Sequence, residues 1–258
     1  MNSTSDPSAS SISFVLVNTT HAGNIGAAAR AMKTMGFSSL RLVEPCKFRT
    51  AEALARASGA DDIVHSAEVF GTLAEAVADC HQVYGTSARS RSLEWAVVSA
   101  REAASQIAET VAVKSRTAMV FGRERSGLTN EELDLCHHRL WIPTNPDFGS
   151  LNLGSAVQVV AYELAMAMSL NQKLNDSKAT EHNPATEEPT DSPADGAAME
   201  HFYQHLEQTL IDTEFLDPDN PRLLLRRLRR YFGRSQPSVT ELNILRGILT
   251  SINKSTSP

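Results

Sequence analysis

The sequence predicts an α/β protein with a mainly parallel sheet flanked by helices, followed by a small helical C-terminal extension. From Ile12 to about Leu170, short apolar or β-branched runs alternate with segments of helical periodicity, which is the pattern of a parallel sheet covered by helices. Beyond residue 198 only helical periodicity remains. A chain of 258 residues, 41% of them hydrophobic, can bury one good-sized core and still carry a second module.

Five short runs predict the strands, because each is apolar or β-branched and is followed by residues that turn the chain. They are Ile12–Asn18, Leu40–Glu44, Val83–Thr86, Ala118–Phe121 and Leu140–Ile142. Helices are predicted between them, most clearly at Ile25–Met35, Leu73–Ala78, Ala100–Glu109, Asn130–Leu135 and Gly154–Leu170. The last of these carries an apolar stripe that includes Val157, Val160 and Leu164.

The remaining segments predict two flexible regions and a helical module. Residues 1–11 are expected to form a disordered N-terminal arm. Residues 171–198 contain three prolines, many acidic residues and almost no large apolar side chains, so they cannot offset the entropy of ordering and predict a flexible acidic linker. Residues 199–258 are expected to form the helical extension, with helices at Met199–Leu216, Arg222–Phe232 and Thr240–Ile252.

Composition excludes several classes of protein. The three cysteines are far apart and form no CxxC motif, which predicts reduced thiols, no zinc site and a cytoplasmic location. The chain has no signal-peptide pattern and no apolar run near the ~18 to 20 residues of a membrane span. A net charge of -6 argues against bulk-charge binding of nucleic acid, although six arginines gather within residues 222–234.

The first chemical motif is Asn24-Ile-Gly-Ala-Ala-Ala-Arg30, which follows a predicted strand and opens a helix. Its small residues let a ligand approach, and a helix N-terminus offers free N–H groups to a phosphate. The alternative is a tight turn whose helix packs through its alanines. The motif is neither GxGxxG nor a P-loop, so nucleotide binding by those mechanisms is not supported.

Three more segments follow predicted strands and are expected at the same sheet edge, where ligands of α/β proteins bind. They are Phe121-Gly-Arg-Glu-Arg-Ser-Gly-Leu128, the loop from Ile142 to Ser155, and Thr86-Ser-Ala-Arg-Ser-Arg91. For the first, the alternative is a solvated charged loop. For Asn152 and Ser155 the alternative is a structural helix cap.

Other constellations carry less chemistry. His201 and His205 are spaced i, i+4 on a helix but lack a third ligand, so a solvated face is favoured and no metal is predicted. The adjacent Cys136, His137 and His138 are interpreted as structural. No GxSxG is present, which disfavours an α/β-hydrolase. The stretch LLLRRLRRYF fits a membrane-surface, partner-binding or RNA-facing helix, with the membrane option disfavoured by its narrow apolar face.

Together, NxGxxxR from Asn24, FGRExxGL from Phe121 and IPxxPxxxSLNLxxAVQ from Ile142, in this order, resemble the signature motifs of the SPOUT superfamily of RNA methyltransferases. The segments GTSARSR and FGRERSGLTNEE, with the C-terminal helices, resemble the TrmJ-type tRNA 2'-O-methyltransferases, which act on the ribose at position 32 of the anticodon loop. The resemblance covers residues 12 to about 170, and the tail only in outline.

The resemblance implies a C-terminal trefoil knot, a homodimer, and S-adenosylmethionine as the cofactor. The residues that match cofactor-binding positions are Thr86, Ser87, Ala88, Gly122, Ile142, Gly149, Ser150 and Leu151. The positions matching catalytic residues are Arg30, Ser150 and Asn152. Gly149 departs from the family pattern, where a small hydroxyl residue is expected, and main-chain contacts should tolerate this change.

For tRNA, the expected RNA-binding residues are Asn24, Arg30, Arg89, Arg91, Arg123, Arg226, Arg229 and Arg230. A guanidinium with a pKa above about 12 has no lone pair to accept a proton, so we expect Arg30 to bind a phosphate and stabilise the developing alkoxide. The alternatives are a ribose 2'-O-methyltransferase for another tRNA position or for rRNA, and a non-catalytic knotted relative that binds RNA.

Overall fold

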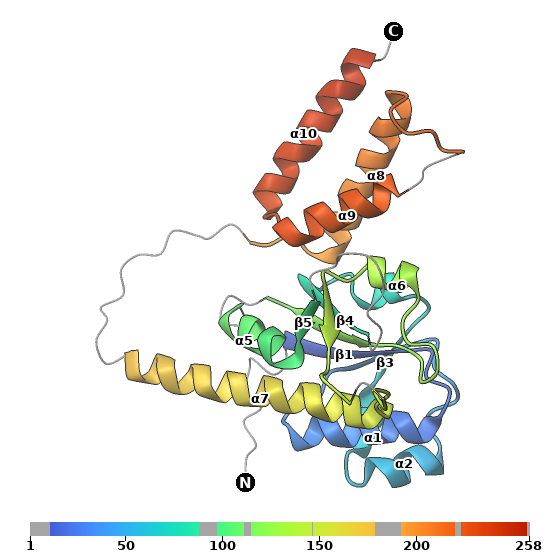
Figure 1. Ribbon diagram of the computed structural model, residues 1–258, viewed down its shortest axis with the longest axis vertical. Coiled ribbons are helices and arrows are strands. Elements are labelled where there is room, and N and C mark those ends of the chain that lie inside the picture. The colour runs from blue at the N-terminus through green and yellow to red at the C-terminus, as the bar shows by residue number, and fades with distance from the viewer. Residues whose placement is uncertain are drawn as a thin grey trace. The chain divides into compact units, whose positions relative to one another are not determined.

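The computed structural model describes residues 11–87, 97–110, 115–145, 147–178, 192–219 and 223–256 (Figure 1). The chain divides into two units, Met1–Pro184 and Ala185–Pro258. The first is an α/β unit and the second is a helical unit. In the described part of the chain, no helix is long and apolar enough to cross a membrane.

The α/β unit is built on a seven-stranded sheet whose pairings are all parallel. In spatial order the strands are β3 (Glu68–Phe70), β2 (Leu40–Val43), β1 (Ile12–Val17), β6 (Thr117–Phe121), β4 (Gln82–Thr86), β7 (His138–Trp141) and β5 (Val97–Ser99). All residues of β1 and β6 are buried, which explains why these central strands read as continuous apolar runs. The predicted α/β class with a parallel sheet is confirmed.

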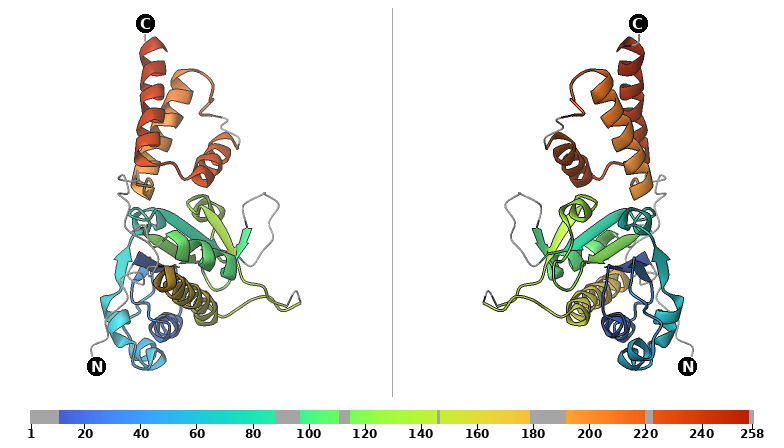
Figure 2. Two further views of the ribbon diagram at one scale, coloured as in Figure 1. Left: turned by 90° about the vertical axis from the view of Figure 1, so that its left-hand side faces the viewer. Right: turned by 90° about the vertical axis from the view of Figure 1, so that its right-hand side faces the viewer.

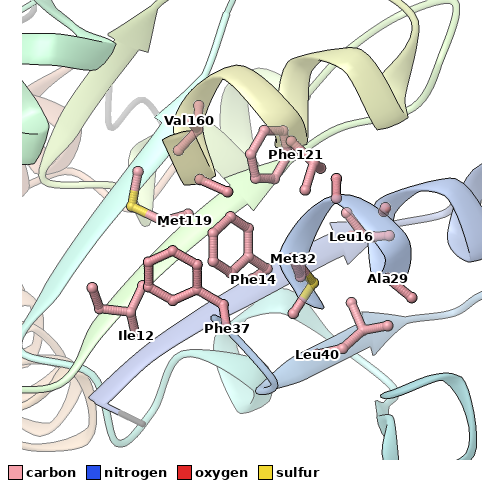
Figure 3. Packing of buried hydrophobic residues seen from close by; sticks show 14 of the residues in the cluster. Ile12, Phe14, Leu16, Ala29, Met32, Phe37, Leu40, Met119, Phe121 and Val160 are labelled. Carbon is pink, nitrogen blue, oxygen red and sulfur yellow. The ribbon is translucent and has the colours of Figure 1, made fainter. Parts of the chain in front are cut away.

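Helices cover both faces of this sheet. Those packed in the larger cluster are α1 (Ala22–Thr34), α3 (Asp61–Ser66), α5 (Ala100–Thr110) and α7 (Leu153–Lys178), while α4 (Leu73–Ala76) and α6 (Asn130–Asp134) join the other cluster. Figure 3 shows Phe14 and Phe121 stacked inside the larger cluster, with their ring centroids 6.2 Å apart. Because side chains alternate along β1, Phe14 belongs to this cluster and Val15 to the other.

Small residues bring α1 against α2 (Ala51–Ala57). A Cβ atom added to Gly26 would overlap the carbonyl oxygen of Ala53, so glycine is required for this close approach. Ala28 and Ala29 are fully buried on the same helix. The packing role that we left open for the first motif is therefore confirmed for these residues.

The helical unit contains α8 (Gly196–Asp212), α9 (Leu224–Ser235) and α10 (Val239–Thr256). Its small core includes Met199, Phe202, Leu242 and Leu249. The carboxylate of Asp195 caps α8 by accepting a hydrogen bond from the N–H of Ala198 at 2.8 Å. Helical periodicity thus predicted this module correctly.

Several boundaries differ from the prediction. Helix α7 continues past Leu170 to Lys178, so the first part of the predicted linker is helical. Residues 171–178 contain no glycine or proline to stop a helix, and the acidic composition alone was not enough to end it. Helix α8 begins at Gly196 rather than at residue 199. Residues 1–10 of the predicted arm and 179–191 of the predicted linker lie outside the described residues.

Candidate active site

The order of the strands brings four loops to one edge of the sheet. Strands β1, β6, β4 and β7 are neighbours, and because they are parallel their carboxyl ends lie at the same edge. The segments that leave these ends begin at Asn18, Ser87, Gly122 and Ile142. Each of the segments predicted to carry chemistry lies at the end of one of these four strands or in the segment that follows it.

A cavity of about 330 Å³ lies among three of these loops, those that follow β4, β6 and β7. Residues predicted to bind the cofactor that line it are Thr86, Ser87, Gly122, Ile142, Gly149, Ser150 and Leu151. The eighth, Ala88, lies outside the described residues. The cavity is further lined by Phe121, the turn from Arg123 to Gly127, and the apolar side chains Leu128, Leu133, Leu140 and Leu153.

One wall of the cavity is the turn that follows β6. Arg123 and Gly127 exchange two backbone hydrogen bonds, with N–O distances of 3.2 and 2.9 Å, and Gly127 has φ +69°. A Cβ atom on Gly122 would overlap the backbone of Gly127 and Leu128. Only glycine therefore fits at residue 122, and this wall presents main chain to the cavity.

The opposite wall is the loop between β7 and α7. The hydroxyl of Thr144 donates to the carbonyl oxygen of Gly149 at 3.2 Å, and the N–H of Phe148 donates to the carbonyl oxygen of Asn145 at 3.0 Å. A Cβ atom on Gly149 would lie 3.1 Å from the Thr144 hydroxyl oxygen. A side chain at this position would therefore require the Thr144 hydroxyl to shift by a few tenths of an ångström.

A chain of side-chain hydrogen bonds joins three of the motifs. The amide Nδ2 of Asn24 donates to Oε1 of Glu124 at 2.9 Å, and Nδ2 of Asn152 donates to Oδ1 of Asn24 at 3.3 Å. Asn152 Oδ1 accepts from the N–H of Gly154 at 3.0 Å, so Asn152 also caps α7, as its structural alternative predicted. The chain connects the cavity wall to the first turns of α1 and α7.

Glu124 is the site residue that the sequence interpretation missed. Its other carboxylate oxygen, Oε2, accepts hydrogen bonds from the N–H and the hydroxyl of Thr20, at 3.4 and 3.3 Å. Its signal in the sequence was an acid between two arginines directly after a buried strand, within a quoted motif. We interpreted the surrounding arginines as functional and gave the acid no role.

The pKa of Glu124 lies below its ordinary value. Burial acts to raise this pKa, but hydrogen bonds from Asn24 Nδ2 and from backbone N–H groups, including that of Thr20, outweigh it. Glu124 is therefore a carboxylate at neutral pH. An ionised acceptor strengthens its hydrogen bond to Asn24.

The predicted RNA-binding arginines have different surroundings. Arg30 is exposed on α1, and its guanidinium makes no hydrogen bond or ion pair within the described part of the chain. Arg123 forms an ion pair with Glu132 at 2.9 Å, and the same carboxylate caps α6 through the N–H of Thr129. Arg89 and Arg91 lie outside the described residues.

Arg229 has partners within the helical unit. Its guanidinium makes two hydrogen bonds to Glu200, at 2.6 and 2.9 Å, and lies 4.5 Å from the centre of the Tyr203 ring. These contacts hold α9 against α8, and binding of RNA by Arg229 stays a prediction. Arg226 and Arg230 are half-buried on the same helix.

His137 has a structural environment, as predicted for this cluster. The imidazole Nδ1 of His137 accepts a hydrogen bond from the backbone N–H of Val83 at 2.9 Å, and the backbone N–H of His137 donates to the carbonyl oxygen of Val83. Burial lowers the pKa of His137 to about 4. Among the residues that the structure describes, no group of three His, Cys, Asp or Glu side chains could hold a metal ion.

Comparison with known proteins decides the family. The model of the SpoU rRNA Methylase family matches residues 11–162. A curated tRNA (cytidine/uridine/adenosine-2'-O-)-methyltransferase TrmJ from Pseudomonas aeruginosa is 50% identical over 245 residues, covering 94% of each chain. The chain belongs to the SpoU methylase family, in its TrmJ branch. A tRNA (cytidine/uridine-2'-O-)-methyltransferase TrmJ from Salmonella typhimurium is 47% identical over 94% of this TrmJ-type chain and 96% of its own.

The helical unit and the solved structures agree with this TrmJ assignment. The model of the TrmJ C-terminal domain matches residues 197–258. The crystal structure of TrmJ from Z. mobilis ZM4 superposes with a TM-score of 0.77 at 33% identity, covering 93% of this chain and 98% of that one. A probable methylase family protein from Haemophilus influenzae gives a TM-score of 0.61 at 41% identity, covering 96% and 97%.

Proposed function

We propose that this chain is a cytoplasmic, S-adenosylmethionine-dependent methyltransferase that modifies the ribose 2'-oxygen at position 32 of tRNA. The observation that carries the proposal is the cavity at the carboxyl ends of three neighbouring strands, β6, β4 and β7, joined by hydrogen bonds to the helix that bears Arg30. TrmJ relatives at 47–50% identity are tRNA 2'-O-methyltransferases, which supports this reaction and this class of substrate.

The cavity residues fit S-adenosylmethionine. Leu128, Leu140 and Ile142 offer apolar surface to an adenine ring, and Gly122 and Gly149 leave room for main-chain hydrogen bonds. A volume of about 330 Å³ lies at the lower end of the usual range for small-molecule sites. When bound, this cofactor supplies a methyl group already activated by its positive sulfur.

The chain itself must orient the ribose and stabilise the charge on its 2'-oxygen. Arg30 would bind a phosphate of the target nucleotide and donate hydrogen bonds to the forming alkoxide, an effect worth about 3 kcal/mol at such sites. The proton then leaves to a phosphate oxygen or to water, since a guanidinium cannot accept it. Ser150 would contact the bound molecules from the cavity wall, while Asn152 and Glu124 position Asn24 and helix α1.

We also propose the trefoil knot and the homodimer that the SPOUT resemblance implies. For the knot, the supporting observation is that β4 pairs with both β6 and β7, so the later chain must pass from one side of β4 to the other. For the dimer, it is the exposure of Tyr162 and Met166, one turn apart on α7. Light scattering of the purified protein would measure the mass of a dimer if this surface is shared by two copies.

The decisive experiment supplies unmodified tRNA and isotopically labelled S-adenosylmethionine to the purified protein. Nuclease digestion and mass spectrometry then locate the labelled ribose. We expect one methyl group at the 2'-oxygen of position 32, with cytidine and uridine both accepted, as in the names of the Pseudomonas and Salmonella relatives. Methylation elsewhere, or of rRNA only, would support a different substrate, and binding of tRNA without transfer would support a non-catalytic relative.

A further inference from the structure

Phe148 is the most exposed large apolar side chain in the described part of the protein. Its side chain is 83% exposed, on the loop between β7 and α7. Exposure of a phenyl ring forgoes the hydrophobic stabilisation that burial of a side chain of this size provides. A ring kept in this position is therefore a candidate for contact with a ligand.

Hydrogen bonds on both sides fix the backbone around Phe148. Its own N–H donates to the carbonyl oxygen of Asn145, and the N–H of Asp147 donates to Oδ1 of Asn145, both at 3.0 Å. After it, the carbonyl oxygen of Gly149 accepts from the hydroxyl of Thr144 at 3.2 Å. These hydrogen bonds hold the backbone that carries the exposed ring of Phe148.

The ring is next to the cavity in the chain. The three residues that follow Phe148, from Gly149 to Leu151, all line the cavity. Figure 2 shows this segment, in yellow-green, standing out from the sheet of the α/β unit. The ring is therefore carried by a loop that forms part of the cavity wall.

We propose that Phe148 stacks on the unpaired base of the target nucleotide and holds that nucleotide at the mouth of the cavity. This inference rests on the proposed function. Sequence-specific and sequence-tolerant proteins both bind single-stranded RNA by stacking its bases on aromatic rings. In an anticodon loop, the target base is available for such a contact.

The surroundings of Phe148 favour a base over a second copy of the protein. Asn145, Asp147 and Ser150 are exposed polar residues on the same loop, and Leu151, the other exposed large apolar side chain among the described residues of this loop, lines the cavity. A dry interface between protein copies requires a contiguous apolar core, whereas one ring is sufficient for one base.

Stacking also explains how one site accepts more than one base. Every base has a π face, so a phenyl ring discriminates little among them. A site that read base edges through buried hydrogen bonds would reject an altered edge strongly. The proposed acceptance of cytidine and uridine is therefore the behaviour that a stacking contact produces.

The test compares Phe148→Ala with Phe148→Tyr, Phe148→Trp and a matched control, Phe215→Ala. Phe215 is 69% exposed in the helical unit and is not one of the residues that line the cavity. We expect Phe148→Ala to raise KM for tRNA about 10-fold, as the removal of one stacking partner predicts. The Tyr and Trp variants and the control should keep KM, and calorimetry should give an unchanged Kd for S-adenosylmethionine in all four.

A second arm isolates the base itself. Fluorescence anisotropy measures binding of a labelled tRNA transcript with cytidine at position 32 and of one with an abasic residue there. The wild type should lose affinity for the abasic transcript, while Phe148→Ala should bind both transcripts equally. Equal reductions in affinity for the two proteins would overturn the proposal.

Two further results would overturn stacking without touching the proposed function. One is an active wild type with unchanged KM in Phe148→Ala. The other is a change in the mass of Phe148→Ala by light scattering, because that would place the ring in a contact between copies. If the wild type transfers no methyl group, the proposed function fails, and the anisotropy arm still decides whether Phe148 stacks on the base.

Discussion

At the scale of single residues, Glu124 organises the candidate site by accepting hydrogen bonds from two different segments. Its Oε1 holds the side chain of Asn24 on α1, and its Oε2 holds Thr20 in the loop after β1. Asn24 in turn accepts a hydrogen bond from the side chain of Asn152, which lies just before α7. A carboxylate that lines the cavity thus fixes the orientation of the helix that carries Arg30.

Replacing Glu124 by Gln should reduce kcat for methyl transfer by about 10- to 100-fold, a range typical of residues that orient a primary group at a site. One carboxylate oxygen would become an amide donor, which cannot accept from Asn24 or Thr20. Glu44→Gln is the matched control, because Glu44 accepts from Asn18 Nδ2 at 3.2 Å but does not line the cavity. Equal activity of the two variants would contradict the positioning role.

The role of Arg30 is tested by Arg30→Lys. We expect a large loss of kcat, because an ammonium cannot reproduce the planar, two-pronged donation of a guanidinium. The loss should persist across the pH–rate profile, since Lys is also protonated at neutral pH. Unchanged activity would refute the need for a planar donor. Recovery of activity only at high pH would instead indicate that residue 30 acts as a base.

At the scale of elements, the contact between α1 and α2 depends on the missing side chain of Gly26. We expect Gly26→Ala to destabilise the α/β unit by about 1–3 kcal/mol, because its Cβ would overlap the Ala53 carbonyl. Gly247→Ala on α10 is the matched helical control, since nothing lies within 4 Å of its added Cβ. It should stabilise the helical unit by about 0.5–1 kcal/mol. Denaturation curves would measure both, and similar effects would contradict the packing argument.

The junction of β4 and β7 should make stability depend on pH through His137. Its pKa falls from 6.5 to about 4 in the folded protein because of burial. Between these pH values the unfolded state binds the proton more strongly than the folded state does. The contribution of His137 to the free energy of unfolding is therefore fully present above pH 6.5 and is lost as the pH falls toward 4. His137→Asn, which keeps an acceptor for the Val83 N–H, should flatten this dependence, whereas the exposed His65→Asn should not. Urea titrations across this pH range provide the measurement.

The elements show which features a sequence reveals. The central strands were predictable because burial on both faces makes them continuous apolar runs, and α7 because of its apolar stripe. Strands β3 and β5 have only three residues each, too few for a period to emerge. Helix α2 packs through alanines, so it lacks the large apolar residues that mark an amphipathic helix.

The sequence could predict which loops meet at the candidate site, but not which side chains in them form hydrogen bonds with one another. Motif order and strand ends predicted which loops would meet, since parallel strands end at one edge. The hydrogen bond between Asn24 and Glu124 joins residues 100 positions apart, and no local pattern encodes such a pair. The ion pair of Arg229 with Glu200 was missed for the same reason, because it depends on how α9 packs on α8.

At the scale of the whole molecule, a net charge of -6 must coexist with the proposed binding of tRNA. Four of the five arginines of α9 separate into two groups. Arg229 is bound to Glu200, whereas Arg227, Arg230 and Arg234 follow a spacing of i, i+3, i+7 along one side of the helix. The second group is the part of the tail that suits contact with phosphates.

We expect Arg227→Ala, Arg230→Ala and Arg234→Ala, combined, to weaken tRNA binding and to reduce the slope of log Kd against log salt by about one for each phosphate that an arginine no longer neutralises. Arg56→Ala, an exposed arginine on α2, is the control and should leave the slope unchanged. Arg229→Ala should instead lower the melting temperature of the helical unit, because it leaves Glu200 without its partner. Unchanged salt dependence in the triple variant would assign α9 to packing.

The position of Glu124 has a consequence for inhibition. The carboxylate is at once part of the cavity wall and an anchor of α1. A small molecule that enters the cavity and pulls this carboxylate away from Asn24 would disturb the grip on RNA as well as block the donor. Such a compound would compete with the donor and weaken tRNA binding through a single contact, so raising the concentration of tRNA alone would not fully restore turnover.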